Sequence, residues 1–165
     1  MQKHLYFICP TDHLEPVIDR AFKRVNYFYS SLGNSIMFDA DTVGQISMLL
    51  ETKEIDTISF ILANDNRIIK DGLGQQEYVH IAGLNTLYKQ IKSQKKDAEI
   101  SWQTPDHQFL ILSYHLNNKI KELKRGLQRQ HIEQRPIQAK IYRRHQQQFN
   151  DIYLDMVCRE HFALN

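Results

Sequence analysis

The chain has 165 residues, of which 42% are hydrophobic and 24% charged, and its net charge at pH 7 is +2. This length and composition predict a single domain over residues 1–165. No run of about 18 apolar residues is present, and the N-terminal apolar run has no small-residue cleavage site, so we expect neither a membrane span nor a signal peptide. Cys9 and Cys158 form no CxxC pair, and we expect reduced thiols in a cytoplasmic protein.

Residues 3–9 form a short apolar run that ends at Pro10 and predicts a buried strand. Thr11 or Asp12 is expected to cap the helix that follows. The apolar stripe of that helix consists of Val17, Ile18, Ala21 and Phe22. Residues 25–30 predict a second strand.

The Gly33-Asn34 pair marks a turn after the second strand. Asp41 or Thr42 is expected to cap the next helix, whose apolar positions repeat at helical spacing. Residues 57–62 then predict a third buried strand. This alternation of strands and helices favours a parallel sheet with right-handed crossovers.

Residues 67–82 contain two glycines and predict no long element. A helix is expected from Leu84 into the polar stretch 93–97, and a longer one starts near Pro105. The longer helix has the strongest apolar periodicity of the chain, at Phe109, Leu112, Leu116, Ile120, Leu123 and Leu127.

Residues 137–142 and 149–156 alternate apolar and polar side chains around a short polar loop, and therefore predict a hairpin. The predicted fold is α/β: a three-layer α/β/α sandwich with a mostly parallel sheet of four or five strands and an antiparallel C-terminal edge strand.

Positive charge gathers late in the chain. Residues 117–148 hold nine Lys and Arg against two Glu, a net +7, so the other residues sum to −5. Such a segment indicates either a solvated surface or an anionic partner. No nucleic-acid motif is present, and Tyr142 is the one aromatic candidate for base stacking. We therefore do not expect nucleic acid binding, although a basic nucleic-acid-binding module remains an alternative.

The order of elements resembles that of the beta-class carbonic anhydrases, from about Leu5 to about Leu154. In that family the first strand leads into Cys-x-Asp-x-Arg, and the third strand ends at His-x-x-Cys. The best local match is the stretch 27–34, where Gly33-Asn34 takes the family's Gly-Asn position. Residues 41–50, 116–123 and 137–142 also resemble family elements. The resemblance implies a beta-carbonic anhydrase-like fold and a homodimer.

The residues that hold zinc in this family are mostly missing. Cys9 takes the first thiolate position, but Asp12 matches the family aspartate only with a one-residue shift, and Leu14 replaces its arginine. Asn64 stands at the histidine position and Arg67 at the second cysteine position. An amide is a poor zinc ligand, and a guanidinium repels a metal ion. We therefore expect no cofactor, no zinc-bound hydroxide and no catalytic residue.

Two alternatives would keep an active site. Cys9, Asp12 and His13 could form a rearranged zinc site, although Pro10 disfavours a regular helix between them. Cys9 could also act as a nucleophile with His13 as the base, against the alternative of a buried, inert thiol.

Arg67 suggests a binding site instead. A cation at the carboxyl end of a parallel strand could hold bicarbonate, phosphate or a carboxylate, assisted by backbone N–H groups at Gly33-Asn34. The competing interpretation is a surface ion pair with Asp65 or Asp71. The candidate pocket residues are Cys9, Asp12, Gly33, Asn34, Asn64 and Arg67.

The sequence thus predicts a non-catalytic carbonic anhydrase-like protein that binds a small anion or a protein partner. The alternative is an active carbonic anhydrase-type lyase with rearranged zinc ligands.

Overall fold

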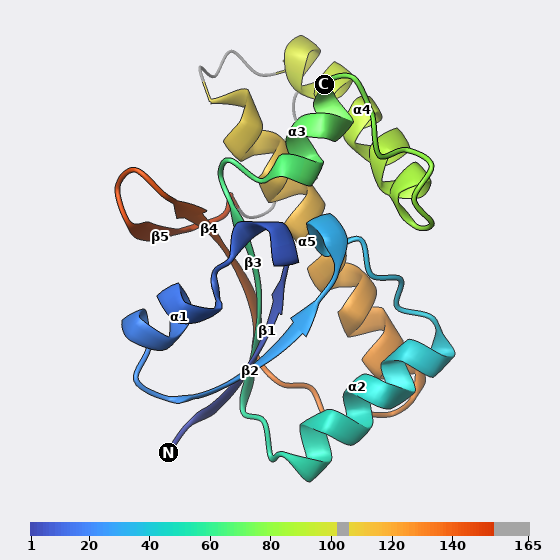
Figure 1. Cartoon of the computed structure of the whole chain (residues 1–165). Helices are drawn as coiled ribbons and strands as arrows, with labels where there is room; N and C mark the ends of the chain where they lie inside the picture. Colours follow the sequence, from blue (N-terminus) through green and yellow to red (C-terminus); the bar gives the residue numbers. More distant parts are fainter. Residues whose placement is uncertain (102–105, 154–165) are drawn as a thin grey trace.

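Five strands form one sheet in the order β2-β1-β3-β4-β5. The computed structural model describes residues 1–101 and 106–153, with no side-chain description for residues 97–101 (Figure 1). The strands are β1 (Lys3–Ile8), β2 (Val25–Ser30), β3 (Thr57–Ala63), β4 (Ile137–Arg143) and β5 (Gln148–Asp151). The first four are parallel, and β5 runs antiparallel to β4 at the edge. The predicted fold class is therefore confirmed.

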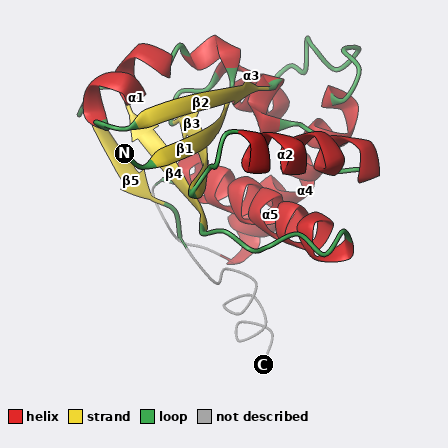
Figure 2. Ribbon diagram, turned by 90° about the horizontal axis from the view of Figure 1, so that it is seen from below, coloured by secondary structure: helices red, strands yellow, loops and turns green. Residues whose placement is uncertain are grey.

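Helices cover both faces of this sheet. They are α1 (Glu15–Ala21), α2 (Ala40–Thr52), α3 (Arg67–Leu73), α4 (Leu84–Ser101) and α5 (His107–Arg129), with 3₁₀ turns η1 (Pro10–Asp12) and η2 (Leu32–Asn34). Figure 2 shows α1 on one face, with α2, α4 and α5 on the other. These are the three layers that the alternating sequence predicts.

The central strands are buried on both faces, which explains their unbroken apolar runs. Side chains of a strand point alternately to opposite faces. Leu5 and Phe7 enter the larger core beneath α2 to α5, whereas Tyr6 and Ile8 enter the smaller core beneath α1. Cys9 follows the alternation into the larger core.

Two predicted helix caps are wrong. Neither Thr11 nor Asp12 caps α1, because residues 10–12 form the separate turn η1 and α1 begins only at Glu15. Asp39 caps α2 by accepting a hydrogen bond from the Thr42 amide at 2.8 Å, two residues before the first expected cap.

Other boundaries also differ from the prediction. The stretch 67–82 contains the short helix α3, and α4 continues to Ser101 instead of ending within 93–97. Strand β5 ends at Asp151, and residues 154–156 of the predicted strand lie outside the described part of the chain. No helix in the described part is long and apolar enough to cross a membrane.

Candidate functional site

The candidate residues gather where the parallel strands end. Strand β1 leads into Cys9, and the neighbouring β3 leads into Asn64. The turn η2, which carries Gly33-Asn34, contacts both of these strands. Because carboxyl ends of parallel strands share one edge, residues far apart in sequence meet here. We call this side of the molecule the carboxyl edge.

Cys9 is fully buried, and its sulfur has two close partners. The backbone N–H of Gly33 donates to Sγ at 3.1 Å, and the Thr11 hydroxyl lies 3.1 Å from it. The neighbouring His13 is exposed, with a left-handed backbone at φ 53°. A buried thiol with these contacts matches the inert alternative more closely than a nucleophile with a histidine base.

Asp12 connects three segments of the chain. Its carboxylate accepts hydrogen bonds from the Ala63 amide at 2.8 Å and from the Asn66 side chain at 2.9 Å. Asn66 in turn caps α3 by accepting from the Ile69 amide at 2.9 Å. Burial raises the pKa of Asp12 to about 6, although both donors oppose the shift. Asp12 therefore links η1 to the end of β3 and to the residue that caps α3, instead of capping α1.

Gly33 and Asn34 are held from several sides. The Asn34 carboxamide donates to the Phe7 carbonyl at 3.3 Å and to the Ile61 carbonyl at 3.2 Å. His115, on α5, donates from Nε2 to the Gly33 carbonyl at 2.7 Å. Burial lowers the pKa of His115 to about 4, so the imidazole is neutral at pH 7.

The backbone N–H groups of this turn have internal acceptors. The Gly33 amide donates to Cys9, and the Asn34 amide donates to the Ser31 carbonyl at 3.1 Å. The sequence predicts that these two N–H groups assist an anion beside Arg67. An anion would have to displace these hydrogen bonds in order to use them.

Asn64 and Arg67 differ from the other candidates. The Asn64 amide donates to the Tyr142 carbonyl at 2.8 Å, its carbonyl accepts from Gln108, and its side-chain oxygen is buried with no partner among the described residues. Arg67 is the first residue of α3 and is exposed.

The expected ion pairs of Arg67 are not formed. Asp65 pairs with Arg144 at 3.1 Å. Asp71 accepts from the Tyr88 hydroxyl and from two backbone amides of the loop that follows α3. Both carboxylates that could neutralise Arg67 are therefore engaged elsewhere.

Sequence reasoning missed three residues at this edge. His115 and Asn66 are described above, and Arg144 donates to the Asp12 carbonyl at 3.2 Å. The signal for Arg144 was available, since it follows β4 and the ends of parallel strands meet. Arg144 thus brings a guanidinium to Asp12 from the β4–β5 hairpin.

Six buried residues of the carboxyl edge make hydrogen bonds inside the protein, and we call them the edge network: Cys9, Asp12, Gly33, Asn34, Asn66 and His115. Arg67 lies outside it, on the surface. Within residues 1–96 and 106–153, no three His, Cys, Asp or Glu side chains are grouped so as to hold a metal ion. Cys9, Asp12 and His13 therefore do not come together as the rearranged zinc site requires.

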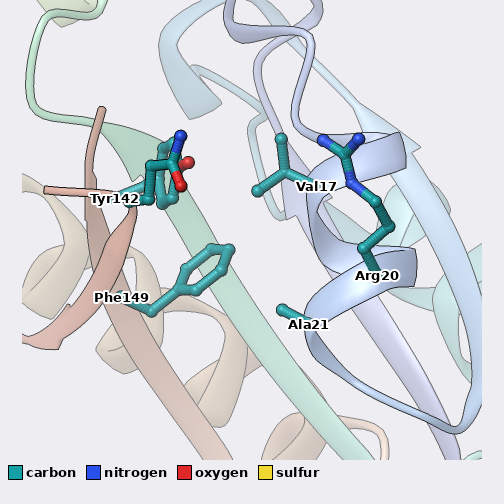
Figure 3. A pocket seen from close by; sticks show the side chains of 6 residues that line it. Val17, Arg20, Ala21, Tyr142 and Phe149 are labelled. Atoms are coloured by element: carbon teal, nitrogen blue, oxygen red, sulfur yellow. The ribbon is translucent and has the colours of Figure 1, made fainter. Parts of the chain in front are cut away.

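A hollow of about 380 Å³ lies away from the candidate residues, between α1 and the β4–β5 hairpin. Figure 3 shows Phe149 and Tyr142 on one wall, with Val17, Ala21 and Arg20 on the other. The Tyr142 and Phe149 ring centroids are 4.8 Å apart. Because Tyr142 is 5% exposed, it offers little face for base stacking, and this weakens the nucleic acid alternative.

Similar proteins are found by comparing three-dimensional structures and not by comparing sequences. No protein-family model and no curated protein match the chain. The beta-carbonic anhydrase CafA of Aspergillus fumigatus matches with a TM-score of 0.68 at 10% identity, over 97% of this chain and 80% of that one. A mutant of the beta-carbonic anhydrase CafD of the same fungus matches with a TM-score of 0.67 at 14% identity, over 93% of this chain and 90% of that one.

A tetrameric beta-carbonic anhydrase from Sordaria macrospora gives a TM-score of 0.64 at 12% identity, over 91% of this chain and 80% of that one. Identities this low establish shared architecture and leave function open. The five-stranded, mostly parallel sheet with its antiparallel edge agrees with these matches. The chain therefore has the fold of the beta-class carbonic anhydrases.

Proposed function

We propose that this chain is a non-catalytic protein with a carbonic anhydrase fold, which binds a small anion at its carboxyl edge. The observation that carries the proposal is the set of side chains at the family's metal-ligand positions. Cys9 Sγ accepts the Gly33 amide at 3.1 Å, while an amide and an exposed guanidinium stand at the other two positions.

The donor set does not fit zinc. A structural or catalytic zinc ion takes three or four thiolate, imidazole or carboxylate ligands, each near 2.0–2.3 Å. Asp12, the nearby carboxylate, is turned toward the Ala63 amide and Asn66. Arg67 offers no lone pair, and its permanent charge opposes a cation. The residues therefore do not support hydration of carbon dioxide by a metal-bound hydroxide.

Metal analysis tests the non-catalytic part of the proposal. The protein is expressed without a histidine tag, purified with zinc in the buffer and dialysed, and its zinc content is measured by mass spectrometry. We expect zinc far below one ion per chain and no carbon dioxide hydration above the buffer rate. Stoichiometric zinc that persists through dialysis would contradict the proposal and support the alternative of rearranged ligands. Cys158 and His161 lie outside the described residues and would be the first positions to mutate in that case.

Arg67 supports the anion-binding part. Its guanidinium is exposed, and the two acidic neighbours that could neutralise it bind other groups. A guanidinium presents planar, paired donors that suit bicarbonate, phosphate or a carboxylate. The site would be an open surface site, because the donors of the neighbouring edge network already have acceptors inside the protein. The buried side-chain oxygen of Asn34 is the exception, since it has no partner among the described residues.

Calorimetry with bicarbonate and phosphate tests this site. We expect weak heat with the wild type, which is lost for bicarbonate and reduced for phosphate in Arg67→Ala, and which is kept in the matched control Arg125→Ala, an exposed arginine of α5. No heat with any protein, or equal loss in both variants, would exclude Arg67 as the anion site.

A homodimer is part of the same proposal. Strand β2 is one of the two edges of the sheet, and its sequence Val-Asn-Tyr-Phe-Tyr-Ser contains no charge and no proline. Exposed edges without such protection tend to pair with another strand. We expect a dimer by light scattering, and a monomer after Val25→Lys, which adds charge to a residue 36% exposed. A monomeric wild type would contradict this part.

A cytoplasmic location also belongs to the proposal. It is supported by Cys9, which is a free thiol in the described structure.

A further inference from the structure

A second concave region lies at the opposite end of α3 from Arg67. It is a hollow of about 280 Å³. Its lining consists of Gly72, Leu73, Gly74, Lys92, Lys95 and Lys96, and we call it the lysine hollow. None of these lining side chains is acidic, so three lysines line one space without a counter-charge in the lining.

Close packing of α3 on α4 explains how the lysines reach this place (Figure 1). A Cβ added at Gly72 would stand 3.0 Å from Tyr88 Cδ1 and 3.2 Å from Ile91 Cδ1, so only glycine allows this approach without adjustment. On α4, positions i, i+3 and i+4 share one face, and Lys92, Lys95 and Lys96 have this spacing. Lys92 and Lys95 lie four residues after Tyr88 and Ile91, which pack on Gly72. The helical face that packs on α3 therefore continues with lysines beside the end of α3.

The lysines are not paired within the described structure. Lys95 is partly buried, whereas Lys92 and Lys96 are exposed, and none has a hydrogen bond or ion pair to a described residue. The nearest acidic residue of α3, Asp71, is held by Tyr88 and by two backbone amides. Like charges at i and i+4 repel each other, so an anion between them would relieve this repulsion.

We propose that the lysine hollow binds the phosphoryl group of a small phosphorylated molecule. Three separate ammonium donors suit a tetrahedral anion that carries nearly two charges and several acceptor oxygens, whereas a single planar carboxylate would leave at least one ammonium unmatched. The glycines at 72 and 74 add no side chain to the floor, which leaves room for the anion. The volume suits a phosphate or pyrophosphate group with the remainder of the molecule in solvent.

Calorimetry with inorganic phosphate, pyrophosphate and ATP tests this site in the full chain. The variant Lys92→Gln/Lys96→Gln removes two of the three charges. The matched control Lys121→Gln/Lys124→Gln removes the same charge from α5. We expect pyrophosphate to bind at one strong site per chain, with affinity lower by about tenfold for each hollow lysine removed and nearly unchanged in the control.

ATP that binds as tightly as pyrophosphate would support a phosphorylated molecule as the ligand, whereas a clear preference for free pyrophosphate would contradict that ligand class. No binding of any probe, or equal weakening in both double variants, would overturn it. Binding of single-stranded DNA with a steep salt dependence in the hollow variant and the control alike would also overturn it, as non-specific attraction. Arg67→Ala should leave pyrophosphate binding intact, so failure here and failure at Arg67 are distinguishable.

Discussion

The two ends of α3 contrast in how their polar groups are satisfied. At its start, the edge network buries a carboxylate, a thiol, an imidazole and two amides, whose donors are directed to acceptors inside the protein. At its end, three lysines face a hollow and have no partner in the described structure. The comparison teaches that polar residues at a fold's usual active edge can be structural, while unpaired charge elsewhere is the better pointer to a ligand.

If the edge network is structural, changes in it should cost stability. If the lysine hollow is a binding site, changes there should cost none. The following predictions test this contrast, beginning with the largest effect.

Among these variants, Gly33→Ala should lower the free energy of unfolding the most. Gly33 has φ +60°, and an added Cβ would lie 2.9 Å from Ile68 Cγ2 and 3.0 Å from Leu87 Cδ2. The left-handed backbone and the crowding together should lower the free energy of unfolding by about 3 kcal/mol. The control Gly83→Ala has φ +89° but no atom within 4 Å, so it should lose only about 1 kcal/mol. Urea denaturation measures both, and equal losses would show that packing at Gly33 is unimportant.

Asp12→Ala should cause the second-largest loss of stability. The Ala63 amide and the Asn66 side chain would lose their buried acceptor, at a cost of about 2 kcal/mol in unfolding free energy. Asp41→Ala, an exposed carboxylate of α2, should cost less than about 1 kcal/mol. Thermal and urea unfolding give both values. If the Asp12→Ala variant is as stable as the wild type and binds anions more tightly, Asp12 lies at a ligand site and its charge opposes anion binding there.

The free energy of unfolding should depend on pH through two contributions of opposite sign, one from two buried histidines and one from Asp12. The pKa values of His4 and His115 fall to about 4 from 6.5, mainly through burial, so the unfolded chain binds more protons and stability rises with pH between about 4 and 6.5. The pKa of Asp12 rises to about 6 from 3.8, so the native state binds more protons and stability falls over about 4 to 6.

In the wild type the two histidines outweigh Asp12, and stability should rise with pH. Asp12→Asn removes the opposing contribution, so its stability should rise more steeply near pH 5, by about 1 kcal/mol per pH unit. Urea titrations between pH 4.5 and 6.5 measure the two slopes. Parallel curves would mean that Asp12 does not titrate as its burial implies.

The smallest effect should have the opposite sign. Lys96→Gln removes the repulsion from Lys92 at i and i+4 and should raise the free energy of unfolding by roughly 0.3 kcal/mol. Lys53→Gln, at the C-terminal cap of α2, should lower it slightly, because a cation there is favourable. Precise thermal unfolding without added phosphate distinguishes them. A loss of stability in Lys96→Gln would show that this lysine has a structural role.

Much of the fold was predictable because periodicity and turn residues are local signals. The short apolar runs give β1, β2 and β3 within a residue or two, and the Gly33-Asn34 turn coincides with η2. The caps were less predictable, because Asp12 and Asp39 are equally good capping residues in sequence and only tertiary contacts decide between them.

The sequence by itself determined the layer order and the unsuitability of Asn64 and Arg67 as metal ligands, since these depend on residue type and spacing. Only the tertiary structure decided that Asp12 serves β3 and α3, that Arg144 and His115 reach the carboxyl edge, and that Gly72 lets α4 place three lysines over α3. The physical reason is that hydrogen bonding and close packing at these places join residues from separate elements, and no local pattern encodes which elements will meet.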